Sequence, residues 1–412
     1  MTIVKIIHAV HLHPLMLTRV SALYKNAYSG LSRSTWLLST VMLINRSGTM
    51  VVPFLTLYLI SIGYTISAAG IVLAFFGLGA FSGAFFGGKL TDKIGFYPVQ
   101  IITLTGGGIM FFVLAQMKSY WFICGFTYML AFINEAFRPA NSTAIAFYSK
   151  PDNRTRSYAL NRLAINIGWA IGSGLGGVLA NINFKYLFYV DGLTNIVAAI
   201  LLLIFLKPVT YKDEPAEHAH VNRASSPYSD KTYLIFIGLT MFFAICFFQI
   251  FTNLSPYFFT VLHFSKPLIG VLLAINGIII AIIEMVLVYK LDGRRKNLSY
   301  ISFGVTLVGL SFLMLNIPGI GPVMAFLILS LLTIGEIFSM PFMNSFWIAR
   351  TSSGNRGQYA ALYTMAWSAA QTLGPLSGSQ VADHFGFKWL WFGVGTICIV
   401  VAFLMTKLNK ST

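Results

Sequence analysis

The stretch Phe184-Lys185-Tyr186-Leu187 returns as Phe387-Lys388-Trp389-Leu390, about half the chain later. Glu135 and Glu336 are separated by nearly the same interval. Because chance matches would not share one offset, the chain is predicted to contain two similar halves. Internal repeats of this kind are typical of membrane proteins in which two helical bundles face each other across a central cleft.

The same offset relates two pairs of glycines. Gly172 and Gly176 correspond to Gly374 and Gly378. Glycines four residues apart lie on one face of a helix, where the absence of a side chain lets two backbones approach closely in a membrane. We therefore expect equivalent helices of the two halves to make equivalent close contacts.

The composition requires a bilayer as the solvent. The chain has 412 residues, of which 57% are hydrophobic and only 10% are charged, and its mean hydropathy is +0.76. It lacks the polar residues that cover a soluble protein. Its apolar runs have the length of roughly 20 residues that an α-helix needs to cross a membrane. Twelve transmembrane helices are predicted, over residues 36–60, 66–87, 98–116, 120–148, 157–181, 186–206, 232–262, 267–289, 298–316, 321–348, 358–382 and 387–406.

The predicted fold class is therefore an all-α membrane protein, with twelve transmembrane helices in two pseudo-symmetric six-helix bundles. Residues 207–231 hold the longest polar stretch, which is typical of a linker. The predicted units are a basic N-terminal segment (1–35), a first bundle (36–206), a cytoplasmic linker (207–231), a second bundle (232–406) and a short tail (407–412).

The basic residues predict the orientation. Only Lys118, Lys185, Lys266 and Lys388 fall in loops on one side, and nearly all others fall in loops on the opposite, cytoplasmic side. Both termini are then cytoplasmic, and the chain is expected to lie in the lipid bilayer of the inner membrane as a monomer. The net charge of +16 is spread over loops, so nucleic-acid binding is not indicated.

A loop signature supports this architecture. The segment Gly88-Lys89-Leu90-Thr91-Asp92-Lys93-Ile94-Gly95 resembles the signature G-x-L-x-D-[RK]-x-G-[RK]-[RK] of the major facilitator superfamily. The resemblance implies a transporter of two six-helix bundles, in which Gly88, Asp92, Lys93 and Gly95 form a gating loop. Phe96 and Tyr97 stand where the signature closes with two basic residues, so part of its charge network is missing.

Several stretches are similar to the proton-coupled oligopeptide transporters of that superfamily. They are Arg46 before Leu57-Tyr58-Leu59, Phe137-Arg138-Pro139 with Ser142, Ile165-Asn166-Ile167-Gly168, and Gly335-Glu336. In that family a helix 1 arginine, a helix 4 lysine and a helix 10 glutamate bind the peptide termini and couple transport to protons. The resemblance implies these roles for Arg46, Arg138 and Glu336. The family's helix 1 motif E-x-x-E-R becomes Met42-Leu43-Ile44-Asn45-Arg46, so both of its carboxylates are absent.

The chain is also similar to the drug:proton antiporters of the superfamily. Their helix 5 carries a Gly-Pro-x-x-Gly-Gly-like step, which becomes Gly172-Ser173-Gly174-Leu175-Gly176-Gly177 here, without the proline. Export of a drug or metabolite by proton antiport therefore stays open beside the import of a peptide-like solute.

Ionisable residues inside the apolar runs are the candidate site. A charge at bilayer depth costs roughly 2.5 to 3.5 kcal/mol on insertion scales, so it faces a partner or a wet cavity. Glu135 and Arg138 are three residues apart and share a helix face, where a proton on Glu135 can change the charge of the pair. Arg46 lies about ten residues inside its helix, too deep for its side chain to reach water easily. Glu336 is the repeat counterpart of Glu135.

Other polar residues have alternative interpretations. Tyr58, Asn166, Asn344 and Gln371 are candidates for hydrogen bonds to a solute, although bonds between helices would use them equally well. Arg162 and Glu284 lie nearer the helix ends and favour interfacial salt bridges, and Asp191 is expected near the external end, exposed to solvent.

The predicted function is proton-coupled transport of a small, amphoteric organic solute, with Glu135 and Glu336 as proton-coupling residues. No cofactor is expected, since protons would be the coupling ion. His8, His11 and His13 do not have convincing metal spacing, and neither a phosphate loop nor a nucleophile with its base is found, so ATP-driven transport and enzyme activity are not indicated. A sensor or channel on a transporter scaffold is the other class, but the linker is too short for an output domain.

Overall fold

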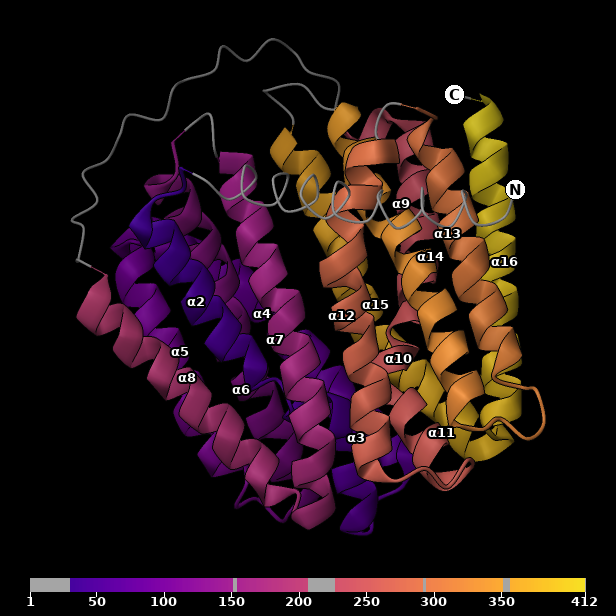
Figure 1. Cartoon of the computed structure of the whole chain (residues 1–412), viewed down its shortest axis with the longest axis horizontal. Coiled ribbons are helices and arrows are strands. Elements are labelled where there is room, and N and C mark those ends of the chain that lie inside the picture. Colours follow the sequence, from indigo (N-terminus) through magenta and orange to yellow (C-terminus); the bar gives the residue numbers. More distant parts are fainter. Residues whose placement is uncertain (1–29, 151–153, 207–226, 292–293, 351–355, 412) are drawn as a thin grey trace, which may run out of the picture.

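The computed structural model describes residues 30–150, 154–206, 227–291, 294–350 and 356–411. The first half contains α2 (Arg33–Ser47), α3 (Val51–Ser61), α4 (Ile66–Ile94), α5 (Phe96–Leu114), α6 (Tyr120–Tyr148), α7 (Arg154–Ile182) and α8 (Lys185–Phe205). The second half contains α9 (Lys231–Phe247), α10 (Gln249–Thr252), α11 (Leu254–Thr260), α12 (Lys266–Leu291), α13 (Asn297–Met314), α14 (Pro322–Ala349), α15 (Arg356–Phe385) and α16 (Phe387–Ser411). The two halves form two bundles side by side (Figure 1).

Length and hydropathy explain why these helices cross a membrane. Within the described residues, ten helical segments are long and apolar enough to span a bilayer, and α2 with α3 counts as one of them. The remaining two crossings are α6 and α15, with 29 and 30 residues. Both are more polar, and both pack against α4, so part of their polar surface faces protein. The predicted twelve-helix fold is confirmed.

The packing repeats between the halves. In the first bundle α2 packs against α7 and α8, α4 against α6, and α5 against α6 and α8. In the second bundle α9 packs against α15 and α16, α12 against α14, and α13 against α14 and α16. Each contact has its counterpart, so the sequence repeat corresponds to a structural repeat.

The paired glycines make the expected close contacts. An added Cβ at Gly172 would come within 3.0 Å of the Ser47 carbonyl oxygen on α2, and one at Gly374 would come within 3.0 Å of the Ile245 carbonyl oxygen on α9. Gly176 and Gly378 extend these contacts along α7 and α15. In both halves the fifth helix therefore lies directly against the first, as the repeat predicts.

The first helix of each half is broken, which corrects the continuous helices predicted over 36–60 and 232–262. The first crossing divides into α2 and α3 at residues 48–50, and the seventh divides into α9, α10 and α11. No proline stands at 48–50, and the break is stabilised instead by a carboxylate on α8, described below.

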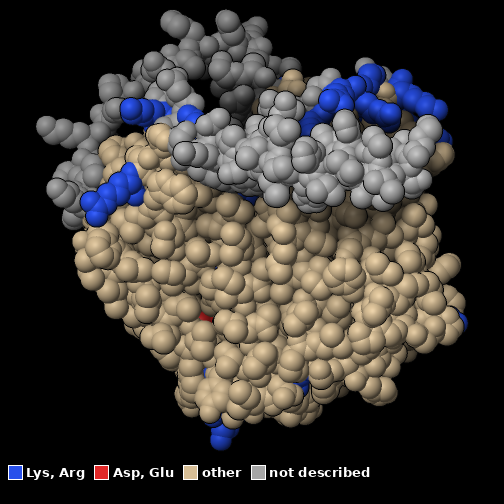
Figure 2. Space-filling view, viewed as in Figure 1, with Lys and Arg blue, Asp and Glu red and all other residues tan. Residues whose placement is uncertain are grey.

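Charge distinguishes the two ends of the molecule. Among the described residues, Lys and Arg gather at the end where α2 begins and α16 ends, here called the basic end (Figure 2). At the opposite end, the described basic residues are Lys118, Lys185, Lys266 and Lys388. Residues 1–29 of the predicted N-terminal segment and 207–226 of the predicted linker lie outside the described residues.

The loop signature lies at the basic end, between α4 and α5. Gly95 ends α4 with a φ of +86°, a conformation that glycine adopts without strain, and its N–H donates to the Thr91 carbonyl at 2.9 Å. The Lys89 ammonium lies 4.3 Å from the centroid of the Phe85 ring. The signature therefore forms a tight reversal between two helices.

A second cluster at the basic end joins helices of the second bundle. Asp230 caps α9 by accepting from the Tyr233 N–H at 3.0 Å, and the Arg350 guanidinium donates to both of its carboxylate oxygens, at 2.8 and 2.9 Å. Burial alone would raise the pKa of this carboxyl, but the bonds from Arg350 and Tyr233 outweigh burial and lower it. Asp230 therefore connects α9 to α14.

The bundles meet at the opposite end. There α7 packs against α12, and α4 packs against α15. An added Cβ at Gly270 of α12 would lie 2.6 Å from the Ser173 carbonyl oxygen of α7, and one at Gly70 of α4 would lie 2.8 Å from the Pro375 carbonyl oxygen of α15. Backbone contacts this close hold the bundles together at that end, here called the sealed end.

Candidate functional site

A cavity of about 550 Å³ lies between the two bundles. Ten helices contribute to it, from α2 and α3 to α15. Its lining residues are Met42, Arg46, Thr49, Val52, Leu73, Phe76, Glu135, Arg138, Asn141, Ser142, Ile145, Tyr158, Asn161, Ile165, Asn166, Trp169, Phe247, Phe248, Phe251, Thr252, Asn276, Ile280, Glu336, Gln371 and Pro375.

Three charged residues form the wall on the first bundle. Glu135 and Arg138 lie one helical turn apart on α6, and the Arg138 guanidinium is 3.1 Å from a carboxylate oxygen of Glu135. The Glu135 side chain is 12% exposed and that of Arg138 is 67% exposed, so the arginine extends into the cavity beyond the carboxylate. The pair predicted from the sequence is present.

Arg46 adds a positive charge without a direct partner. It lies on α2 next to the helix break, where Gly168 of α7 leaves room for it. Its Nε is buried, and the structure gives the Arg46 guanidinium no hydrogen bond to any described residue. The charge of Glu135 attracts the Arg46 guanidinium, and the charge of Arg138 repels it. Because a partly buried guanidinium without hydrogen bonds from the described residues is costly, Arg46 is suited to bind an anionic group in the cavity.

The wall on the second bundle carries a negative charge. Glu336 of α14 lines the cavity and accepts a hydrogen bond from the Asn276 amide of α12 at 2.9 Å. The same amide donates to the Thr333 hydroxyl at 3.1 Å. Asn276 therefore fixes the direction of the Glu336 carboxylate and leaves its second oxygen for other partners.

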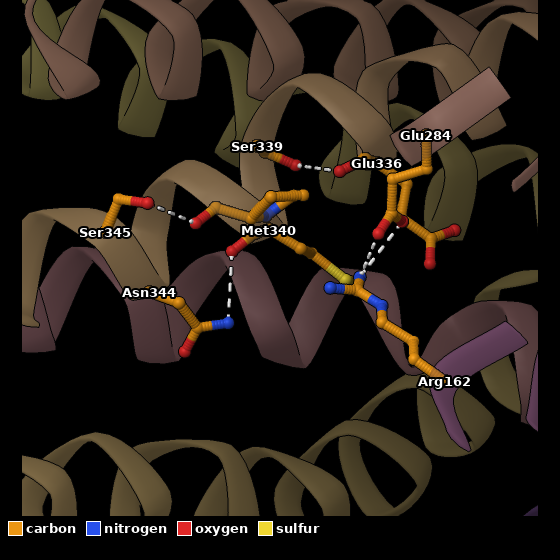
Figure 3. Close-up of polar contacts among 8 residues, drawn as sticks. Arg162, Glu284, Glu336, Ser339, Met340, Asn344 and Ser345 are labelled. Atoms are coloured by element: carbon orange, nitrogen blue, oxygen red, sulfur yellow. Dashed lines mark hydrogen bonds and ion pairs between the residues drawn. The ribbon is translucent and has the colours of Figure 1, made fainter. Parts of the chain in front are cut away.

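An ion pair crosses between the bundles beside Glu336. The Arg162 guanidinium of α7 contacts both carboxylate oxygens of Glu284 on α12, at 2.8 and 2.9 Å. Glu284 is 7% exposed. Figure 3 shows Arg162 reaching towards Glu284, with Glu336 on the neighbouring helix. The salt bridge predicted for Arg162 and Glu284 is confirmed. It is not a local contact at the membrane interface, because it joins the two bundles.

Separating this pair should destabilise the protein. We expect Arg162→Gln to lower the free energy of unfolding by about 1 to 3 kcal/mol, because it leaves the buried Glu284 without its cation, although the exposed half of the arginine reduces the loss. The double variant Arg162→Gln/Glu284→Gln should recover most of it, because no charge is left unpaired. Thermal unfolding of the purified variants measures both. Equal melting temperatures for the single and double variants would contradict the coupling.

Aromatic side chains complete the cavity. Trp169 of α7 and Phe247, Phe248 and Phe251 around the break between α9 and α10 all line it. The Trp169 and Phe251 rings meet edge to face, with centroids 5.3 Å apart. An apolar part of a bound molecule would therefore find a rigid aromatic surface next to the charged groups.

The structure distributes the remaining predicted site residues over several places. Asn166 and Gln371 line the cavity with Arg46, Glu135, Arg138 and Glu336. Asn344 lies outside its lining and bonds within α14 and to the Trp347 indole. Tyr58 lies near the sealed end, where its ring packs on Phe184 and Phe188. Of the gating loop, Gly88, Lys93 and Gly95 lie at the basic end, and the Asp92 side chain is outside the described part of the structure.

Asp191 corrects the expectation of a solvated residue. It is 1% exposed, and its carboxylate accepts from the Met50 N–H at 3.0 Å and from the Val51 N–H at 2.9 Å, at the start of α3. Asp191, Arg46 and Glu135 together line a small cavity of about 50 Å³. Counting residues from the helix end could not reveal this, because the helix break that Asp191 caps has no proline to mark it.

Asn276 was also missed by the sequence reasoning. The signal was available, since Asn276 is a polar residue inside the long apolar run of α12, and such residues usually bond across helices. What the pattern could not show is its partner, Glu336.

Comparisons with known proteins agree with this fold. The family model described as Major Facilitator Superfamily matches residues 35–375. The uncharacterized MFS-type transporter YqjV of Bacillus subtilis is 22% identical over 85% of this chain and 87% of its own. The multidrug resistance protein MdtG of Proteus mirabilis is 31% identical over a shorter stretch, 36% of this chain and 39% of its own.

A solved structure shares the fold. The crystal structure of a POT family transporter in complex with 5-aminolevulinic acid superposes with a TM-score of 0.77. It covers 93% of this chain and 97% of its own, at 14% sequence identity. At that identity the likeness concerns the arrangement of helices alone.

Proposed function

This chain belongs to the major facilitator superfamily, and from that membership we propose that it is a proton-coupled secondary transporter of a small amphoteric organic solute. The observation that carries the proposal is the pair of opposite charges on facing walls of one cavity. Arg46, whose guanidinium has no hydrogen-bonded partner among the described residues, lies on the wall of the first bundle, and Glu336 lies on that of the second.

Amphoteric solutes fit this arrangement better than ions of a single sign. A carboxylate of the solute can bind the guanidiniums of Arg46 and Arg138, while its amine binds Glu336. A solute that bridges both walls draws the bundles together, which favours closure of the cavity around it. An uncharged or singly charged solute would leave one wall unsatisfied.

Proton coupling requires a group whose charge biases the same equilibrium as the solute. Glu135 and Glu336 are the two carboxylates that line the cavity among the described residues. Protonation of Glu135 would release Arg138 from its ion pair, and protonation of Glu336 would remove the negative charge beside the Arg162–Glu284 pair. The first step frees Arg138 for the solute, and the second acts next to a pair that joins the bundles. Each would therefore link protonation to solute binding or to the placement of the bundles, which is the condition for coupling.

Drug export by proton antiport is the second candidate, and the aromatic surface favours it. Trp169, Phe247 and Phe251 offer planar apolar contacts that a lipophilic cation would use, with Glu336 as its counter-charge. The partial similarity to MdtG supports this direction. The two candidates share the cavity and differ in the charge of the solute and in the direction of net flux.

The orientation is part of the proposal. With the basic end in the cytoplasm of a bacterial cell, the described basic residues obey the charge bias of membrane proteins. The sealed end then faces outward, and the cavity extends towards the cytoplasm, since Ile145 and Tyr158 near the basic ends of α6 and α7 line it. One chain is proposed as the transporting unit, because one cavity carries both charged walls.

Transport assays in proteoliposomes test the proposal. With an inward proton gradient, we expect accumulation of a dipeptide such as alanyl-alanine above the level in protein-free liposomes, and loss of accumulation when the gradient is collapsed with a protonophore. Movement of ethidium driven by an imposed proton gradient, in the direction opposite to the protons, would instead support the export candidate. If neither solute moves in response to the gradient and neither causes proton flux, the coupling proposal is wrong.

A further inference from the structure

A second cavity lies at the sealed end. It has a volume of about 510 Å³ and does not share a lining residue with the central cavity. Three of the four lysines described at this end line it, namely Lys118, Lys185 and Lys266. None of its lining residues is an aspartate or glutamate. The three ammonium groups therefore have no carboxylate within the cavity to neutralise them.

The lysines come from separate parts of the fold. Lys118 lies between α5 and α6, Lys185 begins α8, and Lys266 begins α12 of the second bundle. Lys266 is held in place, because its ammonium donates to the Ala180 carbonyl at 3.1 Å and lies 4.3 Å from the centroid of the Phe184 ring. An ammonium has three protons, so Lys266 keeps donors for a ligand.

Tyr58 adds a donor to the same cavity. The residue is only 8% exposed, with its ring packed on Phe184 and Phe188 at centroid distances of 5.9 and 5.1 Å. The described part of the chain offers its hydroxyl no hydrogen bond, and Tyr58 lines the cavity. A hydroxyl that lacks a protein partner and borders a cavity can bond to water or to a ligand there.

We infer that this cavity is a binding site for a phosphate or phosphodiester group, and that the bound anion holds the two bundles together at the sealed end. Three point charges and a hydroxyl suit an anion with several oxygens, for which lysine is a common ligand. Because Lys266 alone comes from the second bundle, the full site exists only while α12 lies against α7. An anion bound there consequently stabilises the sealed state. The group can come from an anionic phospholipid, since the cavity lies at the membrane surface, or from free phosphate.

Binding can be measured on the whole purified protein by its melting temperature in neutral detergent. We expect a saturable increase with sodium phosphate, compared with sodium chloride at equal ionic strength, or with dioleoyl phosphatidylglycerol, compared with dioleoyl phosphatidylcholine. An effect of the lipid without an effect of phosphate identifies a headgroup site, and the reverse identifies a site for the soluble ion. No increase with either probe would overturn the inference.

Variants locate the site. Lys266→Gln, Lys185→Gln and Tyr58→Phe should each weaken binding of the effective probe by about three- to tenfold, as expected for one charged or hydroxyl contact near the surface. Lys388→Gln is the matched control, because Lys388 lies at the same end and does not line the cavity. Equal weakening by Lys388→Gln would show a general charge effect and contradict a built site.

The conformational part has its own measurement. Spin labels at Ser119→Cys and Val261→Cys report the distance between the bundles at this end, and the native Cys124, Cys246 and Cys398 are buried. The effective probe should increase the short-distance population in the otherwise unchanged protein and not in Lys266→Gln. The same shift in Lys266→Gln would mean that the anion does not bridge the bundles.

Discussion

Glu336→Gln is expected to abolish proton-driven transport while the protein still inserts into the membrane. Glutamine keeps the shape of the side chain and can still accept from the Asn276 amide, so the local packing should survive. It removes the charge that we propose binds the amine of the solute, a bond worth roughly 1.5 to 3 kcal/mol, or about 10- to 150-fold in binding. Uptake in proteoliposomes measures the loss.

Two assays separate the roles of Glu336. If it binds the solute, Glu336→Gln should lose both gradient-driven uptake and exchange of solute across the membrane without a gradient. If it binds only the proton, exchange should persist. Asp383→Asn is a suitable control, since this carboxylate is exposed at the sealed end and, among the described residues, accepts one long bond, from the Ser67 N–H at 3.4 Å. Undiminished uptake in Glu336→Gln would remove the residue from the mechanism.

The charged walls of the cavity could be predicted from the sequence because the membrane makes such residues conspicuous. Arg46, Glu135, Arg138 and Glu336 interrupt apolar runs, and an ionisable side chain at that depth needs a cavity or a partner. The half-chain repeat added the architecture, and the paired glycines identified which helices touch. A single sequence contains these features, because they concern residue types and their spacing along the chain.

The partners of these residues depend on contacts between distant helices. Glu284 pairs with Arg162 across the bundles, and Asn276 holds Glu336, at sequence separations of 122 and 60 residues. A shift of α12 by one residue along α7 would replace these pairs, and hydrophobic periodicity does not define that register. Tyr58 was assigned to the wrong place. The motif around it suggested contact with a solute in the central cavity, but its position on α3 places it at the sealed end.

Asp191 explains how the first crossing tolerates its break next to Arg46. The first N–H groups of α3 have no partner within the helix, and both oxygens of Asp191 lie 3.0 to 3.1 Å from the Met50 nitrogen. The link continues to α2, because Asn195 donates to the Asp191 carbonyl at 2.7 Å and accepts from Asn45 at 2.9 Å. Two residues of α8 thus hold the break, the Asp191 carboxylate on the α3 side and Asn195 on the α2 side.

Asp191→Asn is therefore expected to destabilise the protein by about 1 to 3 kcal/mol, because an amide with one acceptor oxygen replaces the two oxygens of Asp191 and its NH2 group can face the N–H donors of α3. This should lower the melting temperature of the purified protein by roughly 1 to 4 °C. Transport should fall as well, since Arg46 lies on the last turn of α2, directly before the break. Asp383→Asn should change neither quantity. A melting temperature equal to that of the unmodified chain would mean that the carboxylate does not hold the break, and the position of Arg46 would then depend on its packing against Gly168 alone.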